Sequence, residues 1–388
     1  MSEKDALVAR YKFGATYIAD FAEFRELVLG KTVVPHQVEI QPGPAGSNIC
    51  WLQCPYCYGG SADDTGERLS GERSVEILEE IAAGGVNKVI FAGYCTDPLN
   101  STYIEDLLSV AIKRGLIFGF NTKSLRVSER FLDLLSSSEI ASGSYFSVSV
   151  DAGFNSSYNT VHAIANESAR IYDRVLKNVA NISSVRKASG VYLDISVAYL
   201  INRLNNTNGE IRKFVADFSE AGCNLMRFTF PQLPRGKVEG ELPTAVPSAE
   251  ECARYRYRLE PLIAELDSDS CRVLFVDADH EHDILRKART TPCVARFVYP
   301  TVGFDGWLYH CSQSSAPNFR KMALGNLAER SFWDLFYDYD ADHLERYFAE
   351  CERIMEEVNC RCDRKEHLVN AGVVKSGVFG CISQGAGQ

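Results

Sequence analysis

Three cysteines near the N-terminus constrain this chain more than any other feature of its sequence. Cys50, Cys54 and Cys57 stand in a C-x3-C-x2-C spacing within the segment NICWLQCPYCYGG, and Tyr56 comes directly before the last of them. Thiolates at this spacing do not share one face of a regular helix or strand, so they predict a loop wrapped around a metal centre. Cysteine thiolates hold iron–sulfur clusters, and three ligands leave one iron of a four-iron cluster open.

The spacing, with an aromatic residue before the third cysteine, resembles that of the radical S-adenosylmethionine (SAM) superfamily. In that family the open iron of a [4Fe-4S] cluster binds SAM. Reductive cleavage of SAM then gives a 5′-deoxyadenosyl radical, which takes a hydrogen atom from the substrate. The resemblance implies that Cys50, Cys54 and Cys57 hold such a cluster and that SAM is a cofactor. The alternative is a structural zinc site, but such sites usually show two Cys/His pairs, and no fourth ligand lies close to this trio.

The composition is that of a globular protein, with 46% hydrophobic and 24% charged residues, enough to build a sizeable core. We expect a cytoplasmic protein without a membrane partner, because there is no run of 18 apolar residues and no signal-peptide pattern at the N-terminus. The net charge of −10 argues against a nucleic-acid partner, which would favour a basic surface. In a reducing compartment, the thirteen cysteines favour metal ligation over disulfides.

Predicted strands alternate with predicted helices after the cysteine loop. The strands are expected at residues 88–94, 116–121, 145–151, 193–200, 225–230 and 272–277. This alternation predicts parallel βαβ units of an α/β protein, and the family resemblance implies a partial (βα)6 TIM-like barrel. Thr102 and Glu105 are spaced as a capping box for one of the helices. In α/β barrels the active site lies at the carboxyl ends of the strands, and the cysteine loop follows a first strand at residues 38–41.

The sequence divides into four expected parts. They are an N-terminal extension (1–36), the radical SAM barrel (37–280), an auxiliary-cluster domain built from a β-hairpin and helices (281–375) and a C-terminal tail (376–388). The hairpin is predicted at residues 297–309, with Asp305-Gly306 as its turn dipeptide.

Polar residues at the predicted strand ends are candidates for binding SAM. The segment from Gly93 to Pro98 resembles the family's Gly-Gly-Glu-Pro-like element, which holds the SAM amino group, although the match is loose. The alternative is a strand–helix turn in which an aspartate caps the helix. A Ser-x-Asp ending on the strand at 145–151 also resembles a SAM-contacting strand of the family. The expected SAM contacts are Tyr56, Gly93, Thr96, Asp97, Asn121, Lys123, Ser147, Ser149, Asp151 and Arg170.

A second group of cysteines lies near the C-terminus. Cys293 is followed by twelve residues, Gly306, four more residues and Cys311, which resembles the C-x(9–15)-G-x4-C element of the twitch and SPASM subfamilies. The resemblance implies one auxiliary [4Fe-4S] cluster, with Cys360 and Cys362 completing the four ligands and Cys351 as the reserve ligand. The alternative is that these residues are buried structural thiols, since free cysteine packs well as a small hydrophobe.

The expected function is abstraction of hydrogen from a small polar substrate of the sugar, aminocyclitol or nucleoside type, leading to dehydrogenation, dehydration or epimerisation. A reductant such as flavodoxin or ferredoxin is the expected protein partner. The first alternative is a maturase of a ribosomally made peptide, although only 49 residues precede Cys50. The second alternative is a non-catalytic Fe–S electron carrier. Weak candidates for catalytic residues are Cys95, Cys381 and Asp279.

Overall fold

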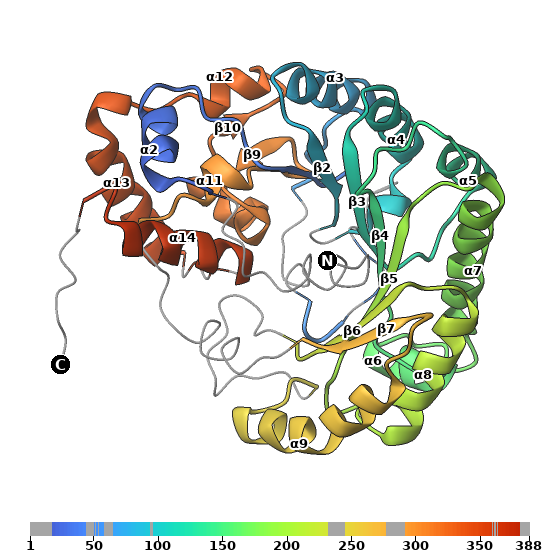
Figure 1. Cartoon of the computed structure of the whole chain (residues 1–388). Coiled ribbons are helices and arrows are strands. Elements are labelled where there is room, and N and C mark those ends of the chain that lie inside the picture. The colour runs from blue at the N-terminus through green and yellow to red at the C-terminus, as the bar shows by residue number, and fades with distance from the viewer. Residues whose placement is uncertain are drawn as a thin grey trace.

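The computed structural model describes residues 18–43, 50, 52, 54–57, 65–93, 96–231, 245–276, 292–358, 360, 362 and 364–380. Its strands form one sheet in the order β10-β9-β8-β1-β2-β3-β4-β5-β6-β7. The sheet curves around a central space, and helices lie along its outer side (Figure 1). Strands β1 to β7 are parallel, whereas β9 runs antiparallel to both β8 and β10. The predicted partial barrel is therefore confirmed, and within the described residues its sheet stays open between β10 and β7.

The bounds of the elements follow the predicted alternation. The strands are β1 (Val38–Ile40), β2 (Lys88–Phe91), β3 (Ile117–Thr122), β4 (Tyr145–Ser149), β5 (Asp194–Leu200), β6 (Leu225–Thr229), β7 (Arg272–Phe275), β8 (Thr301–Val302), β9 (Trp307–Tyr309) and β10 (Gly325–Asn326). The helices are α2 (Phe21–Leu29), α3 (Gly71–Ala83), α4 (Ile104–Lys113), α5 (Glu129–Leu135), α6 (Asn155–Val161), α7 (Ile171–Ser189), α8 (Asn208–Glu220), α9 (Ala249–Leu266), α11 (Ala295–Val298), α12 (Phe332–Phe336), α13 (Leu344–Glu357) and α14 (Arg364–Ser376).

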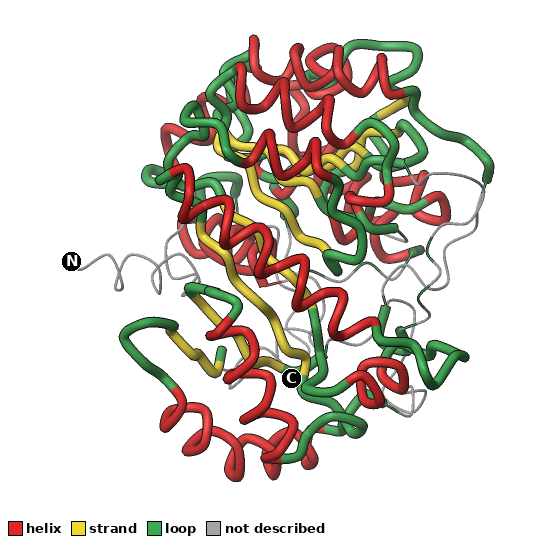
Figure 2. The backbone as a smooth tube through the Cα atoms, turned by 90° about the vertical axis from the view of Figure 1, so that its right-hand side faces the viewer, coloured by secondary structure: helices red, strands yellow, loops and turns green. Residues whose placement is uncertain are grey.

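The core lies between the sheet and the outer helices, which cross in front of the strands in Figure 2. Alternate residues of each strand face these helices. Phe120 of β3 is fully buried, with its ring centroid 5.0 Å from that of Phe91 and 5.6 Å from that of Phe146. Burying an aromatic side chain of this kind contributes about 1.5–3 kcal/mol. The period-two alternation therefore directs the other residues of each strand to the opposite, concave face.

Helix starts show where local sequence signals hold and where they fail. Ser248 and Glu251 form a complete capping box at the start of α9. The predicted box at Thr102 and Glu105 is wrong, because α4 begins at Ile104 without a side-chain cap. Asp97 instead caps a short 3-10 helix, η1 (Pro98–Asn100), whose first residue is a proline. Proline favours the first helical position, so the chain turns earlier than the capping-box pattern predicts.

The C-terminal part continues the sheet of the barrel. Strand β8 pairs in parallel with β1 and antiparallel with β9, and Gly306 takes a positive φ of 81° in the turn between β8 and β9. The predicted hairpin is thus confirmed from Thr301 onward, but its start at Phe297 is wrong. Phe297 belongs to α11, where its ring packs 5.2 Å from that of Tyr339. This aromatic contact favours a helical turn over a longer strand.

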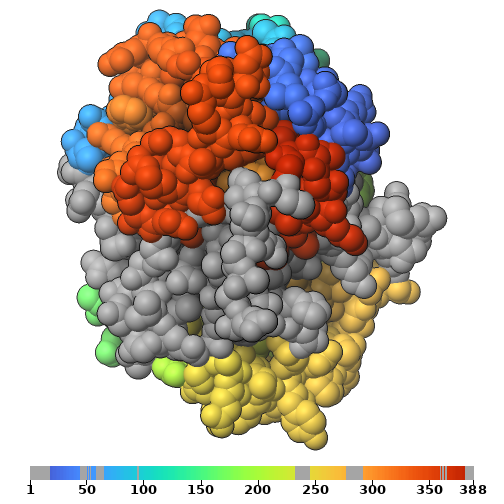
Figure 3. Space-filling view, turned by 90° about the vertical axis from the view of Figure 1, so that its left-hand side faces the viewer, coloured from blue at the N-terminus to red at the C-terminus, as the bar shows by residue number. Residues whose placement is uncertain are grey.

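Helix α2 packs beside the C-terminal helices, as Figure 3 shows on the face turned to the reader. The rings of Phe24 and Phe379 lie 6.2 Å apart, and the Tyr339 hydroxyl donates a hydrogen bond to the carbonyl oxygen of Val28. The first and last described helices are therefore joined. In the part of the chain that the structure describes, no helix is both long and apolar enough to cross a bilayer.

Candidate functional site

The cysteine loop follows β1, at the carboxyl ends of the parallel strands. The Cys57 amide donates to the Cys54 carbonyl oxygen at 2.9 Å, which closes a tight turn between these two cysteines. Cys50, Cys54 and Cys57 are all half-buried and outside any disulfide. Among the described residues, no three His, Cys, Asp or Glu side chains form a site for a single metal ion. Three thiols on one loop at the strand ends are a donor set that fits an iron–sulfur cluster.

Burial acts on the thiols of this loop. It raises the pKa of Cys54 to about 12 and also raises the pKa of Cys50, whereas the Lys123 ammonium acts in the opposite direction on both. The thiols of Cys50 and Cys54 are therefore protonated at neutral pH when no iron is bound. Iron binding must displace these protons, so a nearby cation favours the ligated state.

His162, just after α6, lies against the cysteine loop and was not predicted from the sequence. It is fully buried, with Nδ1 3.0 Å from Cys54 Sγ and Nε2 3.1 Å from the Val150 carbonyl oxygen. Burial, with a further contribution from Lys123, lowers the pKa of His162 to about 3, so the ring is neutral. Since a carbonyl only accepts, Nε2 carries the proton and Nδ1 accepts from the Cys54 thiol. One histidine at the end of a short helix carries no motif that would have revealed this contact.

Asp151, just after β4, contacts the cysteine loop and two neighbouring strand ends. Its Oδ2 accepts hydrogen bonds from the Tyr56 hydroxyl at 2.9 Å and from Lys123 Nζ at 2.8 Å, and its Oδ1 accepts from the Leu200 amide at 2.8 Å. Burial alone would raise the pKa of Asp151, but Lys123 and these hydrogen bonds hold it below its usual value. The structure therefore joins three of the predicted site residues in one buried ion-pair network.

The segment after β2 makes a close turn at Gly93. A Cβ atom there would lie 1.7 Å from the carbonyl oxygen of Thr96, so only glycine fits. The Thr96 hydroxyl oxygen is buried and has no hydrogen-bond partner among the described residues. Asp97 caps η1 and accepts a hydrogen bond from the Thr122 hydroxyl at 2.7 Å. Thr96 thus offers a polar group to a bound molecule, whereas Asp97 is engaged with the protein.

Polar side chains line the concave face of the sheet. Asn121 is in register with Ser147, and Ser147 with Ser196, so these three residues share one face. Ser149 belongs to the same face, and Arg227 of β6 donates from Nη2 to the Ser147 hydroxyl at 3.1 Å. Asn121, Ser147 and Ser149 are therefore brought together as predicted. Ser196 and Arg227 were missed, although the period-two alternation of β5 and β6 carried the signal.

The other predicted residues lie elsewhere or outside the described chain. Arg170 precedes α7, with 81% of its side chain exposed, and pairs with Asp173 at 2.5 Å. It takes no part in the network around Asp151. The weak catalytic candidates Cys95, Asp279 and Cys381 lie outside the described residues.

The C-terminal cysteines converge from separate elements. They precede α11 (Cys293), follow β9 (Cys311), lie on α13 (Cys351) and precede α14 (Cys360 and Cys362). Burial raises the pKa of Cys293 to about 12, and Cys360 and Cys351 raise it further. Burial also raises the pKa of Cys362 far above its usual value, with Cys293, Cys360 and Cys311 adding to the effect. Four of the five thiols, those of Cys293, Cys311, Cys351 and Cys360, belong to one apolar cluster, which also includes Phe304, Phe319, Met322 and Met355.

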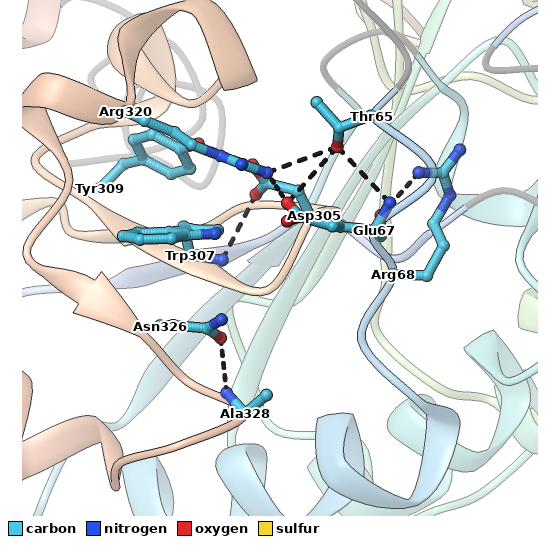
Figure 4. Close-up of polar contacts among 9 residues, drawn as sticks. All are labelled: Thr65, Glu67, Arg68, Asp305, Trp307, Tyr309, Arg320, Asn326 and Ala328. Carbon is cyan, nitrogen blue, oxygen red and sulfur yellow. Dashed lines mark hydrogen bonds and ion pairs between the residues drawn. The ribbon is translucent and has the colours of Figure 1, made fainter.

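Arg320 lies between the hairpin turn at Asp305 and the segment that contains Thr65 and Glu67, as Figure 4 shows. Its guanidinium contacts Asp305 of the hairpin turn at 3.3 Å, the Thr65 hydroxyl at 3.4 Å and the carboxylate of Glu67. The guanidinium of Arg68 lies over the Phe304 ring, 5.2 Å from its centroid. The hairpin that leads to Cys311 is therefore docked on the segment that follows the first cysteine loop.

A family model matches the part of the chain that contains the cysteine loop, and solved structures resemble its fold. The family model of the Radical SAM superfamily matches residues 46–202, a range that contains Cys50, Cys54 and Cys57. The search of curated proteins found no match.

Several solved structures resemble this one in fold. SuiB of Streptococcus suis bound to S-adenosylmethionine has a TM-score of 0.57 at 15% identity, over 81% of this chain and 68% of that chain. The same enzyme bound to the precursor peptide SuiA has a TM-score of 0.55 at 14% identity, over 83% and 70%. Native anSMEcpe with bound AdoMet and Cp18Cys peptide has a TM-score of 0.52 at 15% identity, over 79% and 82%. The cysteine loop and the strand ends that it contacts thus lie within residues 46–202, the range that the Radical SAM superfamily model matches.

Proposed function

We propose that this protein cleaves SAM reductively and uses the resulting 5′-deoxyadenosyl radical to take a hydrogen atom from a small polar substrate. The proposal rests on one observation above all. A loop with three thiols lies at the carboxyl ends of the strands of a radical SAM domain, beside a concave face lined by polar side chains. When bound and reduced by a donor such as flavodoxin or ferredoxin, a [4Fe-4S] cluster supplies the electron that splits SAM into methionine and the radical.

The chain offers groups for both parts of the cofactor. Cys50, Cys54 and Cys57 would hold the cluster. The unpartnered Thr96 hydroxyl, next to the close turn at Gly93, is suited to accept a hydrogen bond from the SAM amino group. Asn121 is exposed on the concave face, where its amide can bond ribose hydroxyls or the SAM carboxylate. These groups orient SAM, and the barrel wall around them limits access of water to the radical.

We also propose an auxiliary [4Fe-4S] cluster in a domain spanning residues 281–375. Cys293, Cys311 and Cys362 are its first three ligands, and Cys360 or Cys351 is the fourth. Support comes from the upward effects that these thiols exert on one another's pKa and from their common apolar surroundings. Thiols that share one apolar cluster fit an iron–sulfur cluster better than dispersed structural cysteines.

Polar groups at the end of β1 favour a substrate rich in hydroxyl or amino groups. Gln41 is 2% exposed, and its Nε2 donates to Glu39 Oε1 at 2.9 Å and to the Ser315 hydroxyl at 2.8 Å. These two bonds fix the side-chain amide, yet its Oε1 is buried without a partner in the part of the chain that the structure describes. An unsatisfied buried acceptor is costly, so a donor on the substrate would be stabilising there. This favours sugar, aminocyclitol or nucleoside substrates and their dehydrogenation, dehydration or epimerisation.

The second candidate function is maturation of a ribosomally made peptide. The observation that favours it is that SuiB and anSMEcpe, which share this fold, are both seen with bound peptides. A peptide substrate would use the same cysteine loop and the same radical.

The test is anaerobic reconstitution with iron and sulfide, followed by addition of dithionite and SAM and measurement of 5′-deoxyadenosine. We expect the wild-type protein to form 5′-deoxyadenosine and Cys54→Ala to form none. Pools of polyols, aminosugars, nucleosides and short peptides are then compared for their stimulation of 5′-deoxyadenosine formation. Stimulation by peptides alone would replace the first substrate class with the second. A loaded wild-type protein that forms no 5′-deoxyadenosine would contradict the proposal and favour an electron carrier.

A further inference from the structure

Asp151 uses most of its hydrogen-bonding capacity within the protein. Its side chain is fully buried and accepts three hydrogen bonds, from Tyr56, Lys123 and the Leu200 amide. The main-chain carbonyl oxygen of Asp151 accepts a further hydrogen bond, from Asn205 Nδ2 at 2.8 Å. A carboxylate has about four acceptor sites, so little capacity remains for a bound molecule. The protein itself therefore satisfies most of the hydrogen bonds of Asp151, which is not expected of a residue whose role is to bind a ligand.

The backbone of Asp151 points to the same conclusion. Its φ of 61° lies in the left-handed region, which residues other than glycine seldom adopt. Such a conformation persists only where the surroundings enforce it, and it is common at functional sites. Here the enforcing contacts come from the end of β5 and from the loop after it, through Leu200 and Asn205. The carboxylate is therefore held in place before any cofactor binds.

Tyr56 transmits this fixed position to the cysteine loop. It stands between Cys54 and Cys57, is 7% exposed, and packs with Val161 and Val246. Its hydroxyl bond to Asp151 ties the turn that carries two of the three cysteines to the end of β4. The Tyr56 ring thus packs against apolar side chains, and its hydroxyl is held by one hydrogen bond. Together these contacts fix the position of the turn.

Lys123 supplies the charge that the network needs. It follows β3, only 17% of its side chain is exposed, and Nζ lies 2.8 Å from Asp151 Oδ2. Burial works against a charged lysine, but Asp151 outweighs it and holds the pKa of Lys123 above its usual value. Asp151 alone would leave a buried negative charge beside cysteines that become thiolates on iron binding. The lysine compensates that charge and favours the thiolate form of its neighbours.

We infer that Tyr56, Asp151 and Lys123 form a latch that positions the cysteine loop for its iron–sulfur cluster, rather than a contact surface for SAM. The inference rests on the proposed function, because it assigns these residues to the cluster of that same site. It gives them a role different from the SAM contacts that their places at the strand ends predict. The three are positioning residues, since they act on iron through the cysteines.

The chain contains a matched control for this latch. Tyr172 of α7 donates to Asp217 Oδ2 at 2.7 Å, and Lys213 Nζ contacts the same oxygen at 2.6 Å. This tyrosine–aspartate–lysine group joins α7 to α8 and has no cysteine in it. Tyr172→Phe therefore removes the same kind of hydroxyl bond as Tyr56→Phe, at a place where the inference predicts no effect on iron.

The experiment measures how fast the reconstituted protein loses iron to a chelator under anaerobic conditions. Losing a buried hydrogen bond to a charged group corresponds to roughly a tenfold change, so Tyr56→Phe is expected to lose loop iron about tenfold faster than wild type. Tyr172→Phe is expected to match wild type. SAM affinity, measured by its effect on the electron paramagnetic resonance signal of the reduced cluster, is expected to stay within about twofold in Tyr56→Phe, because the cluster that remains is intact. Asp151→Asn, if it folds, is expected to behave as Tyr56→Phe does.

Three outcomes would overturn the inference. One is unchanged iron loss in Tyr56→Phe. Another is equal acceleration in both tyrosine variants, which would reflect general destabilisation. The third is a SAM affinity at least tenfold weaker with normal iron retention, which would make these residues SAM ligands. Iron loss is read without SAM cleavage, so a wild-type protein that binds the cluster but forms no 5′-deoxyadenosine would count against the proposed function and leave the latch standing.

Discussion

The two cysteine groups of this chain lie in opposite environments. Cys50, Cys54 and Cys57 are half-buried on a loop beside charged groups, with Lys123 and Asp151 in direct ion-pair contact close by. The C-terminal thiols instead belong to an apolar cluster with aromatic and methionine side chains, namely Phe304, Phe319, Met322 and Met355. The local trio of cysteines thus lies in a polar setting, whereas the cysteines that come from separate elements lie in a more apolar one.

The contrast fits different roles for the two clusters proposed above. A cluster that exchanges a ligand needs access and nearby polar groups to orient that ligand, and the strand ends provide both. A cluster held by four protein thiolates needs neither, and its reduction potential is set by burial and by the polarity around its sulfurs. Arg320 and Arg68 keep the two settings in contact through the hairpin. The difference between the two cysteine groups can be tested by replacing residues of one group at a time.

The largest effect is expected from removing one cysteine of each group. Cys54→Ala and Cys311→Ala should each lose about four of about eight irons per chain, since we propose one four-iron cluster for each group. Only Cys54→Ala should lose 5′-deoxyadenosine formation completely, because the proposal places SAM on the cluster that this loop holds. Iron and sulfide analysis with product chromatography measures both effects. A Cys311→Ala protein with the full iron content would remove the C-terminal site from the comparison.

The same assay identifies the fourth C-terminal ligand. Cys351→Ala and Cys360→Ala each lack one thiol of the wild-type protein. The fourth ligand is the residue whose replacement lowers the iron content. The non-ligand variant serves as the control for the other. Wild-type iron content in both variants would mean that neither thiol is required.

A smaller effect is expected from opening a cavity in the apolar setting. Met355 is 1% exposed beside the C-terminal cysteines, and Met355→Ala should lower the free energy of unfolding by about 2–4 kcal/mol. Met226 of β6 is also fully buried, but in the core cluster of the barrel, so Met226→Ala is a matched control of similar cost. Denaturant unfolding compares the stabilities, and chelator challenge compares the iron.

Only Met355→Ala should speed iron loss from the C-terminal group while leaving the N-terminal group unchanged. Equal iron loss in both methionine variants would show that stability alone, and not the local apolar setting, governs retention.

Local sequence patterns predicted the cysteine loop and the strands of the sheet. The spacing of Cys50, Cys54 and Cys57 gave the loop, and the period-two alternation gave the parallel strands with their polar and apolar faces. The sequence could not show that Asp151 contacts Tyr56, because the two residues are 95 positions apart and meet only when β4 lies beside the loop. For the same reason His162 was missed. Contacts between strand ends depend on the register of the whole sheet, which no local pattern fixes.

The smallest effect is expected from His36, at the amino end of β1, the strand that both regions share. Burial, with a further contribution from Lys88, lowers the pKa of His36 to about 4. The unfolded chain, with a histidine pKa of about 6.5, therefore binds more protons between these values, and stability falls as pH decreases from about 6.5 to about 4. His36 is half-buried, so the loss at pH 5 should be about 1 kcal/mol.

His36→Gln should remove that loss, which is measured as the change in the free energy of unfolding of the iron-free protein between pH 7.5 and pH 5. Because His36 is at the opposite end of β1 from the cysteine loop, the variant should keep wild-type iron retention in both groups at pH 7.5. A variant with the same acid loss as wild type would mean that other buried groups govern the response. A His36→Gln protein that released iron from the cysteine loop would show that the two ends of β1 are coupled. The N-terminal cysteine site would then depend on residues at the far end of the strand.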